Sequence, residues 1–436
     1  MPLAPPPVVH ALPNGLRIVA LPMPWRETVS LSVYIRSGSL HESRRLSGIS
    51  HVVEHMAFKG TRQRDCQRVN LDAERLGAEL NAHTDKDHTA YHIDGLAQDL
   101  PAFVELLADI VLNPTFPEEE LARERQVILQ ELAEVEEDPA ALAFQAFDRA
   151  CYGDGQSAGR PVIGRRANIE RFSRDELCAH VRQQYGAAQV IVAAAGPISP
   201  DALLRSVAAQ FGAMPAGTAQ VLPQPTWQGG LRRAPLAGSG QCQLVLGFES
   251  PPLADEAHLA HVLAATLLGE GMSSPLLDEV RERQGLAYFV ACSADVLPWA
   301  GQFVIEAATG PRQAEAFFNA VAALLLQQAE RRPDPVQLAR ARKQLQLRTR
   351  RALEQPARRL ETAAQELFTF GRLREPAEAL ARLEALPGAA VQRVFAGLLA
   401  SPAAVGLAGS VPRALVARVH DLFLLPAPAA RARAHA

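Results

Sequence analysis

The sequence has 436 residues, 48% of them hydrophobic, so it is long enough for two or three domains with large buried cores. Its 44 Lys and Arg residues nearly balance 47 Asp and Glu residues, and the net charge of −3 excludes the basic surface of a general nucleic-acid binder. The five cysteines are scattered and form no CxxC motif, which argues against a disulfide framework and against a thiolate zinc cluster.

The N-terminal segment carries prolines where a secretory signal peptide would need an unbroken apolar run, and it lacks a basic start. No other stretch reaches the roughly 20 uncharged apolar residues that span a bilayer. We therefore expect a cytoplasmic protein that does not associate with membranes.

Two strands are the first predicted elements. Asn14-Gly15 forms a turn into an apolar strand over 16–21, and residues 29–35 alternate like a strand paired with it, so we expect a hairpin to open the domain. Three further elements follow: a helix that begins near Ser47, a strand over 89–93, and a helix that begins near Pro117. Ser47 is available as the cap of the first of these helices.

A Pro- and Gly-rich segment over 214–240 lies near the middle of the chain and is predicted to be a linker. The parts on either side repeat strand, helix, strand and long helix. We therefore predict an α+β protein with two homologous α/β domains over 1–213 and 241–425, each a mainly antiparallel sheet packed with helices. The basic tail over 426–436 is predicted to be disordered.

The sharpest motif is the run from His51 to His55, His-Val-Val-Glu-His, in the first predicted helix. Residues four apart in a helix project from one face, so His51 and His55 can present their imidazoles to one metal ion, with Glu54 on the same side. Zinc catalysis needs three protein ligands, an open position for water and a carboxylate that accepts the water's proton. The motif supplies two of the ligands and this base.

The helix after Pro117 offers a third ligand. Positions spaced by three and four form one stripe, in which two carboxylates interrupt an apolar face: Leu121, Glu124, Ile128, Glu131 and Val135. A buried carboxylate without a partner would cost several kcal/mol or become neutral, so a nearby cation explains the pattern. We assign Glu131 as the third ligand and Glu124 as the residue that orients the ligands. The alternative carboxylates fall on the more solvated side: Glu134, Glu136 and Glu137.

A looser group of histidines follows the motif, at His83, His88 and His92. On an alternating strand we expect these side chains to face solvent or the rim of the site rather than to bind a second metal ion.

The HxxEH motif, followed 76 positions later by a glutamate within ERQVILQE, resembles the inverted zinc-binding motif of the pitrilysin/insulinase family of metallopeptidases. The resemblance covers nearly the whole chain, through LPNGLRIV, GAELNAHTDKDHTAYH, LADIVLNPTF and SSPLLDEVRERQGLAYFV. It implies that one Zn²⁺ per chain is bound by His51, His55 and Glu131. It also implies that Glu54 is the general base and that Glu124 supports the ligands.

The same resemblance implies further functional residues. The family carries an Arg and a Tyr seven residues apart that bind substrate and stabilise the transition state, and Arg281 and Tyr288 have this spacing. Without the family, a surface cation and a core aromatic are the alternatives. The strand around Asn81 and Ala82 resembles the family's substrate-binding edge, to which an extended peptide adds as a further strand.

The resemblance implies a zinc-dependent endopeptidase that hydrolyses unfolded peptides or small proteins, with Glu54 deprotonating a zinc-activated water. Long family members have four homologous domains and this chain has room for two, so we expect a homodimer in which Arg281 and Tyr288 approach the partner's zinc. Three alternatives stay open: the active subunit of a heterodimeric processing peptidase, a noncatalytic scaffold subunit, and an unrelated zinc hydrolase.

Overall fold

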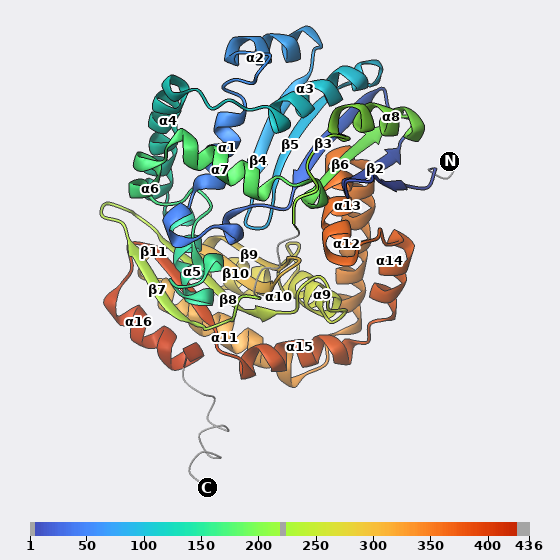
Figure 1. Cartoon of the computed structure of the whole chain (residues 1–436). Coiled ribbons are helices and arrows are strands. Elements are labelled where there is room, and N and C mark those ends of the chain that lie inside the picture. The colour runs from blue at the N-terminus through green and yellow to red at the C-terminus, as the bar shows by residue number, and fades with distance from the viewer. Residues whose placement is uncertain (1–4, 219–223, 425–436) are drawn as a thin grey trace. The chain divides into compact units, whose positions relative to one another are not determined.

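The computed structural model describes residues 5–218 and 224–424 (Figure 1). The chain forms two compact units. The first comprises Met1–Ala133, Arg160–Pro223 and Arg351–Leu373, and the second comprises Glu134–Gly159, Gln224–Arg350 and Arg374–Ala436. The predicted disordered tail lies outside the described residues.

A six-stranded sheet forms the centre of the first unit, with the strand order β1-β2-β6-β3-β5-β4. Its strands are β1 (Val8–Ala11), β2 (Arg17–Pro22), β3 (Thr28–Ile35), β4 (Glu79–Thr84), β5 (Thr89–Leu96) and β6 (Val190–Gly196). Only β2 and β6 pair in parallel; the other neighbours are antiparallel. Its helices are α1 (Ile49–Ala57), α2 (Cys66–Arg75), α3 (Leu100–Leu112), α4 (Glu118–Glu137), which continues into the second unit, α6 (Arg166–Arg171), α7 (Arg174–Gln184), α8 (Pro200–Phe211) and α13 (Pro356–Phe370).

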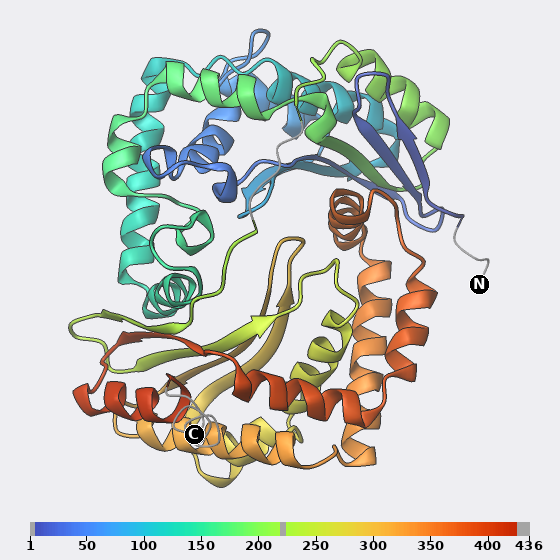
Figure 2. The ribbon, with the colours of Figure 1, turned by 60° about the horizontal axis from the view of Figure 1, so that its bottom comes forward.

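The predicted opening hairpin is wrong, because β6 lies between β2 and β3. Every residue of β6 is buried, as expected for a strand covered on both faces. One face of the sheet packs against the main core and the other against α13, through Leu360, Ala363 and Leu367 (Figure 2). The Asn14-Gly15 turn instead joins β1 to β2.

The second unit contains a five-stranded sheet with the order β7-β11-β8-β10-β9. The strands are β7 (Gly230–Pro235), β8 (Cys242–Ser250), β9 (Ala287–Val296), β10 (Gly301–Thr309) and β11 (Ala404–Gly409). Only β7 and β11 pair in parallel. The unit's helices are α5 (Pro139–Tyr152), α9 (His258–Gly269), α10 (Pro275–Leu277), α11 (Ala314–Glu330), α12 (Pro335–Glu354), which ends in the first unit, α14 (Pro376–Ala385), α15 (Gly388–Ala400) and α16 (Arg413–Val419).

Both sheets share one connectivity. The order β2-β6-β3-β5-β4 corresponds strand for strand to β7-β11-β8-β10-β9, and the single parallel pair occupies the same place in each. The predicted fold class, with mainly antiparallel sheets packed with helices, is therefore confirmed.

The structure divides the chain differently from the ranges predicted on either side of the linker. Helix α5, from the N-terminal half, packs against β7, β8 and β11 of the second unit, whereas α13, from the C-terminal half, packs in the first unit. The predicted linker over 214–240 includes β7. The long helices α4 and α12 carry the chain between the units, so each unit contains a helix from the other half of the sequence.

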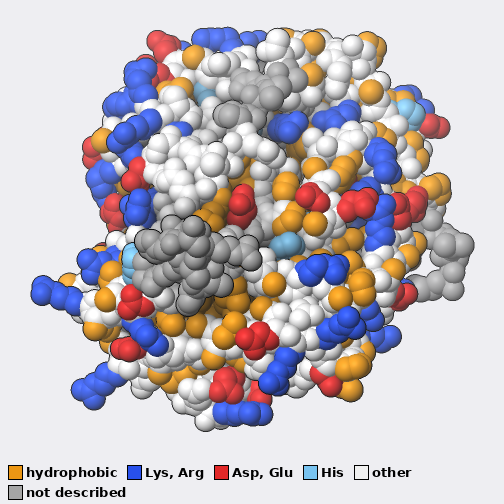
Figure 3. All heavy atoms as spheres, turned by 90° about the horizontal axis from the view of Figure 1, so that it is seen from below, with side chains coloured by type: hydrophobic (Ala, Val, Ile, Leu, Met, Phe, Trp, Pro, Cys, Tyr) orange, Lys and Arg blue, Asp and Glu red, His pale blue; other side chains and the backbone are white. Residues whose placement is uncertain are grey.

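Basic and acidic side chains are interspersed on the face seen in Figure 3, with no broad field of either sign. No helix in the described part of the chain is long and apolar enough to cross a membrane.

Candidate metal centre

Helix α1 presents the HxxEH motif from a firmly anchored position. Its apolar side is buried in the main core of the first unit through Ile49, Val52, Val53 and Met56. The motif's polar side chains lie on the remaining face and are half-buried: His51, Glu54 and His55. The position of these side chains is thus determined by the packing of the helix beneath them.

The start of α1 differs from the prediction that Ser47 is its cap. Gly48 is the N-cap residue, with a φ of 100° and with Ile163 O only 2.8 Å from where a Cβ would stand, so a side chain does not fit there. The buried carboxylate of Glu42 accepts the backbone N–H groups of Gly48, at 2.8 Å, and of Ser50, at 2.9 Å. A side chain seven residues before the first residue of the helix thus satisfies two backbone donors at its N-terminus.

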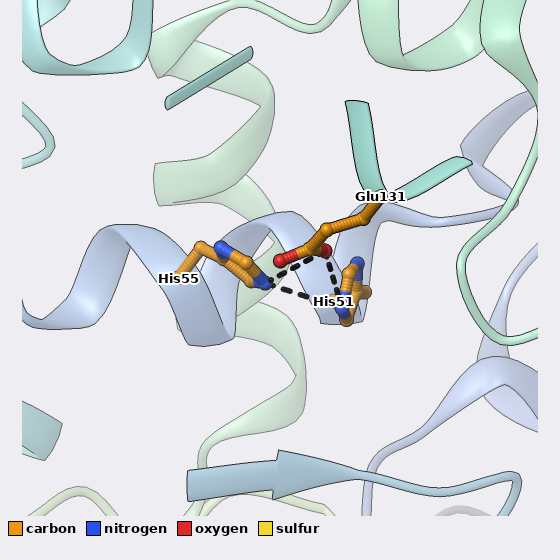
Figure 4. Close-up of side chains that lie close together, drawn as sticks. All are labelled: His51, His55 and Glu131. Carbon is orange, nitrogen blue, oxygen red and sulfur yellow. Dashed lines mark hydrogen bonds and ion pairs between the residues drawn. The ribbon is translucent and has the colours of Figure 1, made fainter. Parts of the chain in front are cut away.

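Three potential ligand atoms converge at this helix (Figure 4). The Nε2 atoms of His51 and His55 are 3.2 Å apart. Glu131 reaches them from α4, with its Oε2 at 3.8 Å from His51 Nε2 and 3.5 Å from His55 Nε2. A tetrahedral zinc ion, at about 2.0–2.1 Å from its nitrogen ligands, would hold ligand atoms about 3.3–3.4 Å apart. The observed separations fit this ion.

Glu124 orients one of the two imidazoles. His55 Nδ1 lies 3.0 Å from Glu124 Oε1, and Lys59 Nζ lies 2.7 Å from the other carboxylate oxygen. Although burial opposes ionisation, hydrogen bonds from His55 and Lys59 hold the pKa of Glu124 below its usual value. A histidine that donates from Nδ1 to a carboxylate keeps the lone pair of Nε2 for a metal. Glu124, which the sequence analysis assigned as the orienting residue, therefore contacts the candidate ligand His55.

The protonation of His51 also suits metal binding. Burial, together with the neighbouring His55, lowers the pKa of His51 to about 3. The imidazole is therefore neutral at physiological pH, which is the form that coordinates metal ions.

Glu54 has the environment of a carboxylate that can exchange a proton. Burial raises the pKa of Glu54, and the charge of Glu131 raises it further, while a hydrogen bond from Thr84 acts in the opposite direction. The Thr84 hydroxyl donates to Glu54 Oε2 at 2.6 Å. A carboxyl group with a raised pKa is a better general base and a better acid near neutral pH than an exposed one.

Strand β4 lies beside the metal centre at the edge of the sheet, and α1 packs against it. Asn81, whose side chain is exposed, faces His92 of β5, and Ala82 faces Tyr91. The Asn81 Oδ1 atom accepts the N–H of Ala82 at 2.8 Å. The predicted substrate-binding residues thus lie on an edge strand next to the candidate ligands.

Arg281 and Tyr288 lie in the second unit, near the start of β9. Tyr288 is 85% exposed, which excludes the alternative that it is a core aromatic. The guanidinium carbon of Arg281 is 5.7 Å from the centroid of the Tyr288 ring, a cation–π arrangement that couples the two side chains.

A buried histidine beneath α1 should make the first unit acid-sensitive. Burial lowers the pKa of His180 from its ordinary value of 6.5 to about 4, and its Nε2 lies 3.5 Å from Ser50 Oγ in α1. Because the folded-state pKa is below the unfolded one, the stability that neutral His180 contributes is complete above about pH 6.5 and is lost as the pH falls toward 4.

We expect the unfolding free energy of the wild type to fall relative to His180→Gln by up to about 3 kcal/mol between pH 7 and pH 4. Thermal unfolding of the two metal-free proteins at each pH measures this difference, with His10→Gln as the control for loss of a histidine elsewhere. A difference between wild type and His180→Gln that does not change with pH would contradict the expectation.

Comparisons with known proteins identify the family. A family model described as insulinase, peptidase family M16, matches residues 17–164, and a model described as the peptidase M16 inactive domain matches residues 171–345. The first range contains all three candidate ligands and Glu54. The second range contains no HxxEH motif.

Similar proteins of several bacteria carry the name uncharacterized zinc protease. That of Rickettsia felis is 30% identical over 371 residues, covering 85% of this chain and 89% of the relative. That of Streptomyces coelicolor is 30% identical over 418 residues, covering 94% and 91%. Among solved structures, a protease from Helicobacter pylori has a TM-score of 0.85 at 22% identity and covers 93% of this chain and 99% of its own.

Proposed function

Because the chain belongs to the insulinase family of peptidases, family M16, we propose that it is a zinc-dependent endopeptidase that hydrolyses peptide bonds in unfolded peptides or small proteins. One observation carries the proposal: a carboxylate oxygen of Glu131 from α4 meets the Nε2 atoms of His51 and His55, all within 4.8 Å of one another, and the two histidines share helix α1 with Glu54. These three residues would hold one zinc ion per chain.

Bound zinc supplies Lewis acidity, which polarises a peptide carbonyl and lowers the pKa of water. Glu54 accepts the proton of the attacking water and passes it to the leaving amine. The hydrogen bond from Thr84 to Oε2 holds the Glu54 carboxylate in one orientation and leaves Oε1 to carry the proton. Glu124 holds the His55 ring in place.

The substrate binds in extended form along β4. Its main chain adds to the edge of the sheet at Asn81 and Ala82, displacing the Asn81 side chain from the Ala82 N–H. Main-chain recognition depends little on the side chains of the substrate, which favours broad specificity for unfolded peptides.

Two chains form the working enzyme in this proposal. Arg281 and Tyr288 act on a substrate at the partner chain's zinc, where the exposed Tyr288 hydroxyl donates a hydrogen bond to the oxyanion of the tetrahedral intermediate. Since one sequence carries both the HxxEH motif and this pair, a homodimer is self-sufficient. A heterodimer with a homologous subunit is the alternative, and the mass and activity of the purified single chain distinguish the two.

Metal removal tests the proposed activity. Purified protein should cleave a quenched fluorescent peptide, lose this activity after treatment with a chelator, and regain it when zinc is restored. The same peptide held in a stably folded protein should be cleaved much more slowly. Absence of cleavage by the zinc-loaded protein across a varied peptide set would favour the noncatalytic scaffold.

Mixing two inactive variants tests action across the dimer. Arg281→Ala and Glu54→Gln should each be strongly impaired, and their mixture should recover up to about a quarter of wild-type activity. Random exchange makes half of the dimers mixed, and each mixed dimer has one intact site. No recovery, although differently tagged chains are shown to have exchanged, would disprove shared sites.

A further inference from the structure

A second group of histidines lies on the β4–β5 hairpin, outside the metal centre described above. His83 Nε2 is 3.2 Å from His88 Nε2, and His83 Nδ1 is 3.0 Å from His92 Nε2. The expectation that all three face solvent or a rim is wrong for His88, which is only 4% exposed and whose ring lies 5.9 Å from that of Tyr34. A turn brings His88 back over the sheet, which strand alternation alone does not predict.

The register of the hairpin separates this group from Glu54. His83 is paired with Ala90, and Asn81 with His92, so His83 and His92 lie diagonally on one face of the sheet. Thr84, the next residue, points to the opposite face, where its hydroxyl reaches Glu54. The histidine group therefore occupies the face that α13 covers, whereas α1 and its motif lie on the other.

The ligand atoms of this group have the spacing of a metal site. One atom from each of His83, Asp85 and His88 lies within 4.8 Å of the others, as in the set of His51, His55 and Glu131. The separation of the two Nε2 atoms is 3.2 Å in both places. This is close to the roughly 3.3–3.4 Å between two nitrogen ligands of a tetrahedral zinc ion.

The outer nitrogen of each imidazole is also engaged. His88 Nδ1 donates to Asp87 Oδ1 at 2.8 Å, as His55 Nδ1 does to Glu124. With His83 protonated at Nδ1, that nitrogen donates to His92 Nε2. The Nε2 lone pairs of His83 and His88 then face each other, an arrangement that is repulsive unless a cation or a proton lies between them. Such outer hydrogen bonds are typical of metal-binding histidines.

From this geometry we propose that His83, His88 and Asp85 form a second metal site, which binds a divalent transition metal with affinity for imidazole, such as zinc. A bound ion would join the end of β4 to the turn before β5. It would thereby brace the hairpin that carries Thr84, the residue that holds Glu54.

Metal counting in protein without a polyhistidine tag tests the site independently of peptidase activity. The variant His51→Gln/His55→Gln removes the first centre, so only the second site is counted. After equilibrium dialysis against Zn²⁺, this background protein should retain one zinc ion per chain, and saturating zinc should raise its Tm. Adding His83→Gln and Asp85→Asn should abolish both effects, while His10→Gln should change neither.

His92→Gln supplies a graded variant, because His92 is not a proposed ligand and reaches the outer nitrogen of His83. Zinc should bind about 10–100-fold more weakly than to the background protein. Circular dichroism of each metal-free variant verifies that the fold is retained. The proposal is overturned if the background protein retains no zinc, or if it binds zinc equally well with and without His83→Gln and Asp85→Asn. Either result would mean that a proton, shared along the chain of histidines, holds the group together.

Discussion

Glu54→Gln should lower kcat/KM for a quenched fluorescent peptide by about 10²–10⁴-fold while zinc stays bound. Glutamine keeps the shape of the side chain and can still accept the Thr84 hydroxyl hydrogen bond, but it cannot accept a proton from water. None of the three candidate ligands is changed. Steady-state kinetics and metal analysis of the same preparation measure both parts of this expectation.

The matched control for this variant is Glu137→Gln, at the exposed end of α4, which should leave kcat/KM and zinc content unchanged. If Glu54→Gln retained full activity with zinc bound, Glu54 would not be the base. Loss of both zinc and activity would show that the side chain supports the site rather than the proton transfer.

Glu131→Gln should release zinc and with it the peptidase activity. The amide that replaces the carboxylate is a neutral and weaker ligand, and the remaining pair of imidazoles would have to hold the ion with water alone. The loss of zinc affinity should exceed the roughly 10–100-fold expected for Glu124→Gln, which only orients His55. Competition with a chelator of known affinity ranks the variants.

The other carboxylates of α4 provide the test of this assignment. Glu134→Gln and Glu137→Gln should bind zinc as the wild type does, because both residues are exposed and neither belongs to the group of converging ligand atoms. Release of zinc by one of these variants, with Glu131→Gln still loaded, would overturn the proposed ligand set.

The local patterns in the sequence indicated which side chains of one helix lie together. The three-four spacing of α4 predicts that Glu124 and Glu131 lie on one side of the helix, and in the structure both carboxylates reach His55. The four-residue spacing in α1 predicts that His51 and His55 lie together, and their Nε2 atoms are 3.2 Å apart. Both patterns depend only on the geometry of a single helix, which repeats every 3.6 residues whatever surrounds it. That α4 lies near α1 follows from a separate argument, because two carboxylates on an apolar face need a cation beside them.

Predictions about neighbours in space failed more often. The expected pairing of β2 with β3 ignored β6, which comes more than 150 residues later in the chain and inserts between them. A cap usually stands next to its helix, which favours Ser47 in the sequence, whereas the carboxylate of Glu42, seven residues before the helix, accepts the N–H groups of Gly48 and Ser50. Likewise, the local sequence pattern does not show that α5, from the N-terminal half, packs in the second unit, or that α13, from the C-terminal half, packs in the first.

The sequence by itself determined the helix faces, the metal-binding motif and the resemblance to a family of zinc peptidases, because these depend on residue types at short, regular spacings. Only the tertiary structure decided which distant segments meet. It brought β6 between β2 and β3, Thr84 to Glu54, and His88 to His83 across a turn. Such contacts depend on strand order, register and packing, which are properties of the whole chain and leave no periodic signal in the sequence.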